Sequence, residues 1–138
     1  MFQSKTQIRV RYAETDQMGY VYYGNYAQYY EVARVEALRQ IGLTYKMFED
    51  SGLMMPVLSL NCKFYKPARY DDLLTIITTI KEMPRVRVHF DYAGFNEAEL
   101  ELGIGQTTLA FIDMETQTPV KCPDLLAKKL AVFFTDPV

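Results

Sequence analysis

The sequence predicts an α+β domain in which an antiparallel sheet carries one long helix on a single face. A strand pattern comes first, a helix pattern of about 16 residues follows it, and strand patterns then fill most of the chain from residue 55 to residue 113. This segregation of one helix from most of the strands favours a helix packed on an antiparallel sheet over alternating βαβ units. At 138 residues, the chain (residues 1–138) is expected to form a single domain.

The first strand is expected at residues 7–12. Ile8, Val10 and Tyr12 alternate there with Arg9 and Arg11, and this two-residue period is typical of a strand with one buried face. The strand is expected to lead directly into the loop that holds most of the candidate site.

The long helix is expected in the stretch NYAQYYEVARVEALRQIG, which begins at residue 25. Asn25 is expected to cap it and Gly42 to end it. Glu31 and Arg34, three residues apart, are expected to form an ion pair. A shorter helix is expected at residues 45–50. The predicted buried stripe, with spacings of three and four, consists of Tyr26, Tyr30, Ala33, Ala37 and Ile41.

Four strands are expected next, at residues 55–66, 73–81, 85–95 and 100–113. The third alternates between an apolar and a polar face. Gly103 and Gly105 lie two apart on the last of these strands, which leaves room on one face for a bulky neighbour, expected to be the long helix. A short helix in DLLAKKLAVF and a frayed tail at residues 136–138 complete the chain. The two faces of the third strand are Val86, Val88, Phe90 and Tyr92 against Arg85, Arg87, His89 and Asp91.

Composition excludes several classes of protein. The net charge is −2 and no block of basic residues is present, so no nucleic-acid partner is expected. No apolar run has the roughly 20 residues of a membrane helix, and the start MFQSKTQIRV is too polar for a signal peptide. A cytoplasmic protein without a membrane partner is therefore expected. Cys62 and Cys122 form no CxxC pair and are expected to be free thiols in or near the core.

Several catalytic motifs are missing from the sequence. It has no GxSxG elbow, HExxH motif, P-loop or GxGxxG motif followed by a helix, and neither a metal nor a bound cofactor is expected. The single histidine, His89, falls among the outward-facing residues of a strand, where a surface or ligand contact is favoured over a general base.

Asp16 is the candidate catalytic group that remains. It follows the first strand and precedes the expected helix start at Asn25, where the helix dipole stabilises a negative charge. Free backbone N–H groups at a helix start can also bind the carbonyl oxygen that becomes negative during acyl transfer. One loop could thus supply both a carboxylate and an oxyanion hole. The alternative is that Asp16 is a turn residue and the nearby tyrosines belong to the core.

The stretch YAETDQMGYVYYGNYAQYYEVARVEAL resembles the signature of the hotdog-fold acyl-CoA thioesterases, the 4-hydroxybenzoyl-CoA thioesterase and YbgC-like family. The resemblance continues through CKFYKPARYDDLLTI and spans roughly residues 8–113. It implies a hotdog fold, in which a curved antiparallel sheet wraps around one long central helix. It also implies an enzyme that hydrolyses an acyl-CoA to a free carboxylic acid and CoA.

Carried over to this chain, the resemblance makes Asp16 the catalytic carboxylate, as nucleophile or as base for water. Tyr23 would offer its backbone N–H to the thioester oxygen, and Gly19 would let the loop pass close to the substrate. Tyr22 and Asn25 beside it are further implied substrate contacts. Many YbgC-like members carry a histidine where this chain has Tyr23, so an imidazole beside the carboxylate is not implied here.

The implied partner is the acyl-CoA substrate. Arg85, Arg87 and Lys66 could meet its phosphates, although such residues are equally typical of a solvated surface. The family joins two subunits edge to edge with active sites at the junction, which implies a homo-oligomer, dimer or homotetramer. The sequence does not identify the acyl group. It also leaves open whether the thiol is CoA or an acyl-carrier protein.

Two alternatives to this enzyme share the implied fold. A hotdog dehydratase would use a histidine with a carboxylate, and His89 lies far from the motif in sequence. A catalytically idle module that binds acyl-CoA or acyl-carrier protein would keep the groove and release no thiol.

Overall fold

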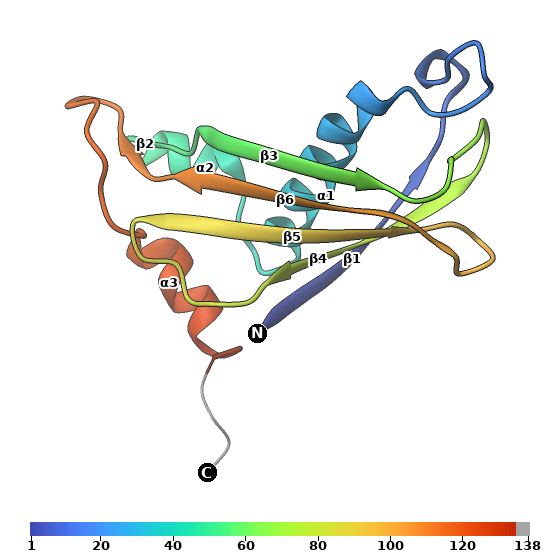
Figure 1. Cartoon of the computed structure of the whole chain (residues 1–138). Helices are drawn as coiled ribbons and strands as arrows, with labels where there is room; N and C mark the ends of the chain where they lie inside the picture. The colour runs from blue at the N-terminus through green and yellow to red at the C-terminus, as the bar shows by residue number, and fades with distance from the viewer. Residues whose placement is uncertain (135–138) are drawn as a thin grey trace.

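The described part of the chain, residues 1–134 of a computed structural model, folds into one antiparallel sheet with a long helix across one face (Figure 1). Within these residues the main sheet has five strands in the order β1-β4-β5-β6-β3, and all neighbours are antiparallel. The predicted α+β architecture is confirmed. The strands are β1 (Phe2–Arg9), β3 (Val57–Phe64), β4 (Leu73–Ile80), β5 (Arg87–Phe95) and β6 (Glu101–Ala110).

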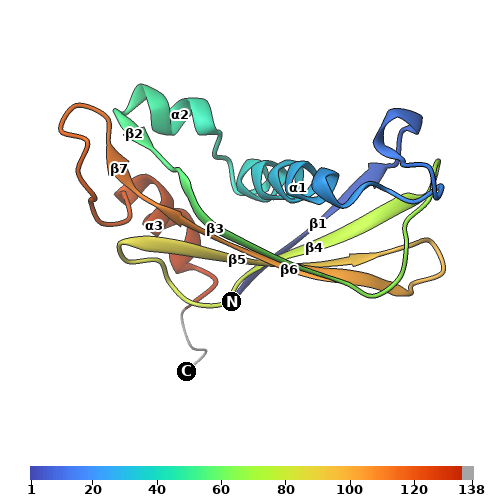
Figure 2. The same ribbon diagram turned by 45° about the horizontal axis from the view of Figure 1, so that its top comes forward.

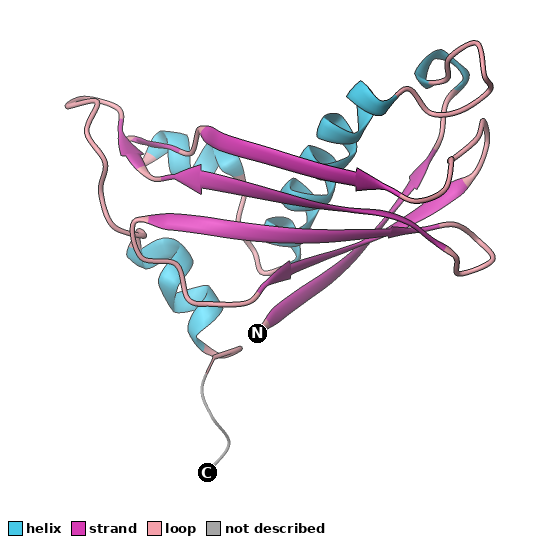
Figure 3. Cartoon of the chain, viewed as in Figure 1, coloured by secondary structure: helices cyan, strands magenta, loops and turns pink. Residues whose placement is uncertain are grey.

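The smaller elements lie at the ends of the sheet (Figure 3). Helix α1 (Tyr26–Gln40) is followed by α2 (Tyr45–Asp50), which matches the predicted short helix, and the chain reaches α3 (Asp124–Ala131) after the sheet. Strands β2 (Leu53–Met54) and β7 (Ile112–Asp113) form a separate two-stranded ribbon. Two 3-10 turns, Tyr12–Glu14 and Tyr23–Asn25, flank the loop before α1. The predicted frayed tail lies outside the described residues.

The first strand was placed too late by the sequence pattern. β1 begins at Phe2 and ends at Arg9, so Tyr12 lies in a 3-10 turn instead of the strand. The inward positions of β1 include the polar Ser4, which conceals the alternation in the sequence. The buried Ser4 hydroxyl donates to Oε1 of Gln40 at 2.7 Å, so the core accommodates it.

Two predicted contacts of α1 are wrong. The Asn25 side chain makes no capping hydrogen bond and instead donates to the carbonyl oxygen of Glu14 at 2.8 Å. Arg34 forms no ion pair with Glu31 among the described residues, because its buried guanidinium faces the core. It donates to the Tyr45 hydroxyl at 2.7 Å and, as part of the same core network, to Tyr92.

The prediction that the long helix packs against the glycine pair of β6 holds for Gly105, which contacts Tyr30 of α1. The Tyr30 ring is fully buried and stacks on Tyr92 of β5, with ring centroids 4.4 Å apart. A Cβ atom at Gly105 would overlap the Tyr30 ring. Gly103 has a different neighbour, because a Cβ there would lie 2.5 Å from the Lys63 carbonyl oxygen of the adjacent strand. The helix is therefore seated on the sheet through Gly105 alone of this glycine pair.

The outer strand β3 is left uncovered. Figure 2 shows α1 lying above the sheet, and its sheet contacts are mainly with β1 and β4. All residues of β3 except Cys62 are exposed, including Leu60 and Phe64, which face the same side as α1. An eight-residue edge with apolar side chains is typical of a strand that pairs with another chain. No helix among residues 1–134 is long and apolar enough to cross a membrane.

We expect Gly105→Ala to destabilise the protein by about 1–3 kcal/mol, because the added methyl group must displace the Tyr30 ring in a packed core. Urea denaturation followed by circular dichroism measures the change. Gly94→Ala in the neighbouring strand is the matched control, since its Cβ would meet no atom closer than 3.9 Å. Equal stability of the two variants would contradict the assigned packing.

Candidate active site

The loop that carries Asp16 is a small antiparallel hairpin. Thr15 pairs with Val21, and the Asp16 N–H donates to the carbonyl oxygen of Tyr20 at 2.8 Å. Gly19 closes the turn with φ +79 and donates its N–H to the Asp16 carbonyl oxygen. A Cβ at Gly19 would meet nothing within 4 Å, so within this chain its left-handed backbone is what requires glycine.

The Asp16 carboxylate is held through one oxygen only. Its Oδ1 accepts the N–H of Met18 at 2.9 Å and the N–H of Tyr20 at 3.2 Å. Its Oδ2 accepts no hydrogen bond from residues 1–134, and the side chain is half-buried. The turn role and the catalytic role weighed for Asp16 are thus compatible, because Oδ1 closes the turn while Oδ2 stays available to a ligand.

The 3-10 turn Tyr23–Asn25 presents free backbone donors. Tyr23 and Gly24 begin this turn, where N–H groups have no acceptor within the turn itself, and no loop hydrogen bond of residues 1–134 uses either group. The Tyr22 ring lies against Gly24, where an added Cβ would come within 2.7 Å of it. The exposed rings of Tyr22 and Tyr23 are 4.7 Å apart. This turn, ahead of α1 itself, is therefore the candidate oxyanion hole.

Glu14 is a central residue of this region that the sequence reasoning missed. Its carboxylate is buried and accepts hydrogen bonds from the Arg11 N–H at 2.8 Å and from the Tyr29 hydroxyl at 3.0 Å. Burial alone would raise the pKa of Glu14, but the hydrogen bonds from Arg11 and Tyr29 outweigh it and lower that pKa. The spacing of Arg11 and Glu14, three residues apart at a turn, was the available signal, because it lets the Glu14 carboxylate accept the Arg11 N–H and pair with its guanidinium.

The turn between β3 and β4 supports the hairpin from outside. The Val21 N–H donates to the Ala68 carbonyl oxygen at 2.8 Å, and the Arg69 guanidinium lies 5.0 Å from the centre of the Tyr20 ring. Lys66 is exposed in this same turn, so it is the one predicted phosphate contact that lies near the hairpin within a single chain.

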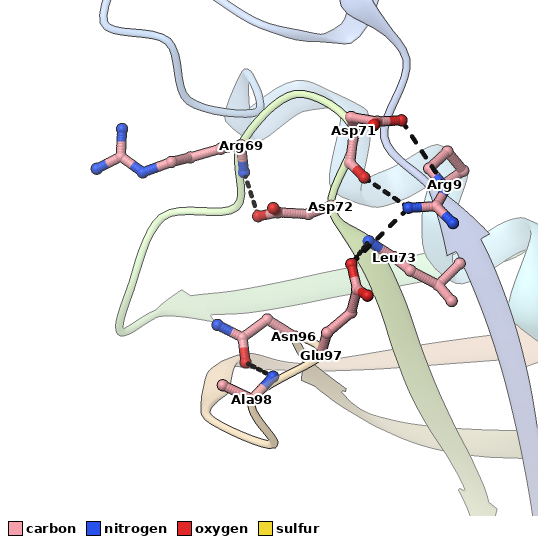
Figure 4. Close-up of polar contacts among 8 residues, drawn as sticks. All are labelled: Arg9, Arg69, Asp71, Asp72, Leu73, Asn96, Glu97 and Ala98. Atoms are coloured by element: carbon pink, nitrogen blue, oxygen red, sulfur yellow. Dashed lines mark hydrogen bonds and ion pairs between the residues drawn. The ribbon is translucent and has the colours of Figure 1, made fainter.

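Figure 4 shows how that turn is fixed at its far end. Arg9 of β1 donates to the Asp71 carbonyl oxygen at 2.7 Å, and the Arg69 N–H donates to the Asp72 carboxylate at 2.8 Å. Glu97, from the loop after β5, accepts the Leu73 N–H at 3.2 Å. Two other segments, β1 through Arg9 and the loop after β5 through Glu97, therefore brace the turn against which the Asp16 hairpin rests, and the bond from Arg69 to Asp72 closes it internally.

The start of β5, where Arg87 is the first residue and Arg85 precedes it by two, lies at the opposite end of the sheet from the loop between β1 and α1 that holds Asp16 (Figure 1). Arg85 and Arg87 line a groove of about 740 Å³ on the face of the sheet away from α1, together with Lys81 and His89. The His89 Nδ1 atom and the Thr108 hydroxyl are 2.8 Å apart, so the histidine is a groove residue. Within one chain the structure brings together Asp16, Gly19, Tyr22, Tyr23, Asn25 and Lys66, and it separates Arg85 and Arg87 from them.

The remaining tyrosines of the motif have structural positions. Tyr26, Tyr29 and Tyr30 are buried between α1 and the sheet, and the Tyr26 ring packs edge-on against Phe64 of β3 with centroids 4.9 Å apart. Burial raises the pKa of each of the three phenols. They therefore stay protonated near neutral pH and can donate hydrogen bonds, as Tyr29 does to Glu14.

The chain matches a family model described as the thioesterase superfamily over residues 18–102. It is 35% identical over 122 residues to a putative acyl-CoA thioesterase, YneP of Bacillus subtilis, with 88% of each chain covered. It is 29% identical over 116 residues to the acyl-CoA thioester hydrolase YbgC of Escherichia coli O6:H1, covering 84% of this chain and 87% of that one.

The fold is similar to that of a solved DHNA-CoA thioesterase from Staphylococcus aureus. The TM-score is 0.83 at 34% sequence identity, with 97% of this chain and 85% of that chain covered. The matched family segment begins at Met18 and so starts two residues after Asp16.

Proposed function

The chain belongs to the thioesterase superfamily and has its hotdog fold, and from this we infer that it hydrolyses an acyl-CoA to a free carboxylic acid and CoA. Relatives that match over more than four fifths of the chain are named as acyl-CoA thioester hydrolases. The single observation that carries the mechanism is the pairing, in one loop, of an unused carboxylate oxygen on Asp16 with unused N–H groups at Tyr23 and Gly24.

We propose that the thioester carbonyl oxygen binds the Tyr23 N–H. This N–H would stabilise the negative charge that develops on that oxygen in the transition state, and loss of one oxyanion-hole donor typically costs roughly 2.7–4 kcal/mol. Because the donor belongs to the main chain, the Tyr23 side chain is not required for it. Asn25 would then act through the shape of the turn, since its amide is already bonded to Glu14.

Two routes are open to the Asp16 Oδ2 atom. As a base it would take a proton from water, and the resulting hydroxide would attack the acyl carbon. The C–S bond would then break, and the departing CoA thiolate would take the proton from Asp16. As a nucleophile it would attack the acyl carbon itself, displace CoA and leave a mixed anhydride that water then hydrolyses. Both routes need the same placement of Oδ2 beside the acyl carbon.

We expect Asp16→Asn to lower turnover of acyl-CoA by about a hundredfold or more, since the amide can neither accept the proton nor attack. Tyr23→Phe should leave kcat nearly unchanged because the backbone N–H persists. Thiol release over a panel of acyl-CoA compounds measures both. Asp50→Asn, at an exposed acid paired with Lys46 on α2, is the matched control.

Unchanged turnover in Asp16→Asn would contradict the proposed catalytic role. Tight binding of acyl-CoA without any thiol release by the parent protein would instead favour the alternative, a non-catalytic module that binds acyl-CoA or acyl-carrier protein. Within one chain the dehydratase alternative finds no support, since His89 lies in the groove at the opposite end of the sheet from Asp16 and its Nδ1 atom is 2.8 Å from the Thr108 hydroxyl.

We also propose a homo-oligomer that forms through β3. Antiparallel pairing of two β3 edges would satisfy the unpaired backbone groups of both strands and cover Leu60 and Phe64. It would also bring the Val57 end of one strand beside the Phe64 end of the other. The start of β5 in one subunit would then flank the Asp16 hairpin of the other.

A cytoplasmic location is also inferred, because the free thiols of Cys62 and Cys122 fit a reducing compartment.

We expect Leu60→Glu to convert the oligomer to a smaller species, because it places a charge on an edge that is exposed in one chain and buried in the assembly. Light scattering coupled to size exclusion measures the mass. Leu100→Glu, at an equally exposed leucine outside β3, is the control and should leave the mass unchanged. An unaltered mass for Leu60→Glu would rule out the β3 junction.

This assembly would give the distant arginines a role. β5 lies two strands from β3, about 10 Å at the usual strand spacing, so Arg85 and Arg87 of one subunit could bind the phosphates of a CoA whose thioester lies at the partner's hairpin. Lys66 of the catalytic subunit would approach the same ligand from the other side of the junction.

We expect the double variant Arg85→Ala and Arg87→Ala to raise KM for acyl-CoA about tenfold or more, because charge-assisted bonds to phosphate are lost. Hydrolysis of the same acyl group on N-acetylcysteamine, which has no nucleotide, should be unaffected. Lys128→Ala with Lys129→Ala on α3 removes the same charge elsewhere and serves as the control. An equal change for both substrates would contradict phosphate binding in the groove.

A further inference from the structure

We infer that Glu14 is a positioning residue for this reaction, which fixes the loop of Asp16 and the amide turn of Tyr23 to helix α1. The inference rests on the proposed function. Glu14 acts through other groups, because none of its hydrogen bonds involves Asp16 or the free N–H of Tyr23.

The carboxylate of Glu14 ties the loop to the helix. Oε1 accepts both the Arg11 N–H and the Tyr29 hydroxyl, and Tyr29 lies in the first turn of α1, where it is buried. Oε2 accepts Nη2 of Arg11 at 3.0 Å and Nε at 3.3 Å. Both oxygens are thus engaged, and removal of the side chain would leave the buried Tyr29 hydroxyl without its partner.

The backbone of Glu14 holds the amide turn. Its carbonyl oxygen accepts two donors, the Tyr22 N–H at 2.9 Å and the Asn25 side-chain amide at 2.8 Å. These two residues flank Tyr23 and Gly24, whose N–H groups stay unused. The same residue therefore fixes both ends of the segment that would bind the thioester oxygen.

The other half of the site begins immediately after Glu14. Thr15 pairs with Val21 and bonds its hydroxyl to the Tyr12 carbonyl oxygen at 2.7 Å, and Asp16 follows. Asp16 therefore lies two residues after Glu14, and the amide turn lies between Tyr22 and Asn25, which both bond to the Glu14 carbonyl oxygen. A displacement of about 1 Å between such groups can lower the rate about a hundredfold.

The burial of this carboxylate is better explained by positioning than by stability alone. A buried carboxylate must recover its lost hydration, and replacing buried ionic groups by apolar ones is often neutral or stabilising. The ion pair with Arg11 adds little by itself, because the Arg11 side chain is largely exposed. What an apolar residue could not reproduce is the set of directional bonds to Tyr29 and Arg11.

The test is a double-mutant cycle between Glu14→Ala and Asp16→Asn, with thiol release and unfolding free energy measured for all four proteins. We expect Glu14→Ala to lower kcat about a hundredfold with KM changed less than about threefold. Added to Asp16→Asn it should lower kcat little further, whereas the loss of stability should be the same in both backgrounds. Glu14→Gln, which keeps an acceptor for Tyr29 and Arg11, should recover about tenfold of the loss.

Glu36→Ala is the matched control. Glu36 forms an ion pair with Arg39, also three residues apart and 3.2 Å long, on the exposed face of α1. It should leave kcat unchanged. If Glu14→Ala does not fold, Tyr29→Phe takes its place in the cycle, because it removes only the hydroxyl that bonds Glu14.

The outcomes separate this inference from the proposed function. Unchanged kcat in the Glu14 variant, or losses that multiply in the double variant, would overturn the positioning role while a large Asp16→Asn effect upholds hydrolysis by Asp16. Unchanged turnover in Asp16→Asn would overturn the proposed function and the inference with it.

Discussion

The arrangement of the candidate site depends on one buried carboxylate. Through its side chain Glu14 connects the loop after β1 to the first turn of α1, and through its carbonyl oxygen it holds the turn that precedes α1. Neither connection is local, since Tyr29 lies 15 residues and Asn25 11 residues further along the chain. The loop at the sheet's end, which the β3–β4 turn already contacts, is thereby also joined to the helix.

Helix α1 is held in place because its buried side chains pack on the sheet. Tyr30 fills the gap above Gly105 and stacks on Tyr92, which fixes α1 along the sheet, and the neighbouring Tyr29 then presents its hydroxyl to Glu14. The β3–β4 turn supports the hairpin from the other side through Ala68. The sheet thus positions the site through two contacts, one with helix α1 and one with the β3–β4 turn.

The sequence predicted what short-range patterns encode. The bounds of α2 and most of the predicted buried stripe of α1 follow from the period of the apolar residues, although Ile41 lies just past the helix. In β5 the predicted alternation holds from residue 87 on, whereas Val86 precedes the strand and is exposed. The start of β1 was missed because polar Ser4 occupies an inward position. The cap at Asn25 was wrong because the amide bonds a carbonyl oxygen 11 residues away, and Glu14 was missed because a carboxylate is usually solvated. The separation of Arg87 from Asp16 depends on which strands pair and in which direction they run, which no local pattern contains.

The central claim is that the Asp16 carboxylate and the Tyr23 N–H act on one thioester. The most direct measurement is a crystal structure with an acyl-CoA analogue in which a methylene replaces the sulfur and the carbonyl is kept. The account predicts the carbonyl oxygen about 2.7–3.1 Å from the Tyr23 nitrogen, with Asp16 Oδ2, or a water bonded to it, about 3–3.5 Å from the carbonyl carbon. A carbonyl bound away from either group would contradict it.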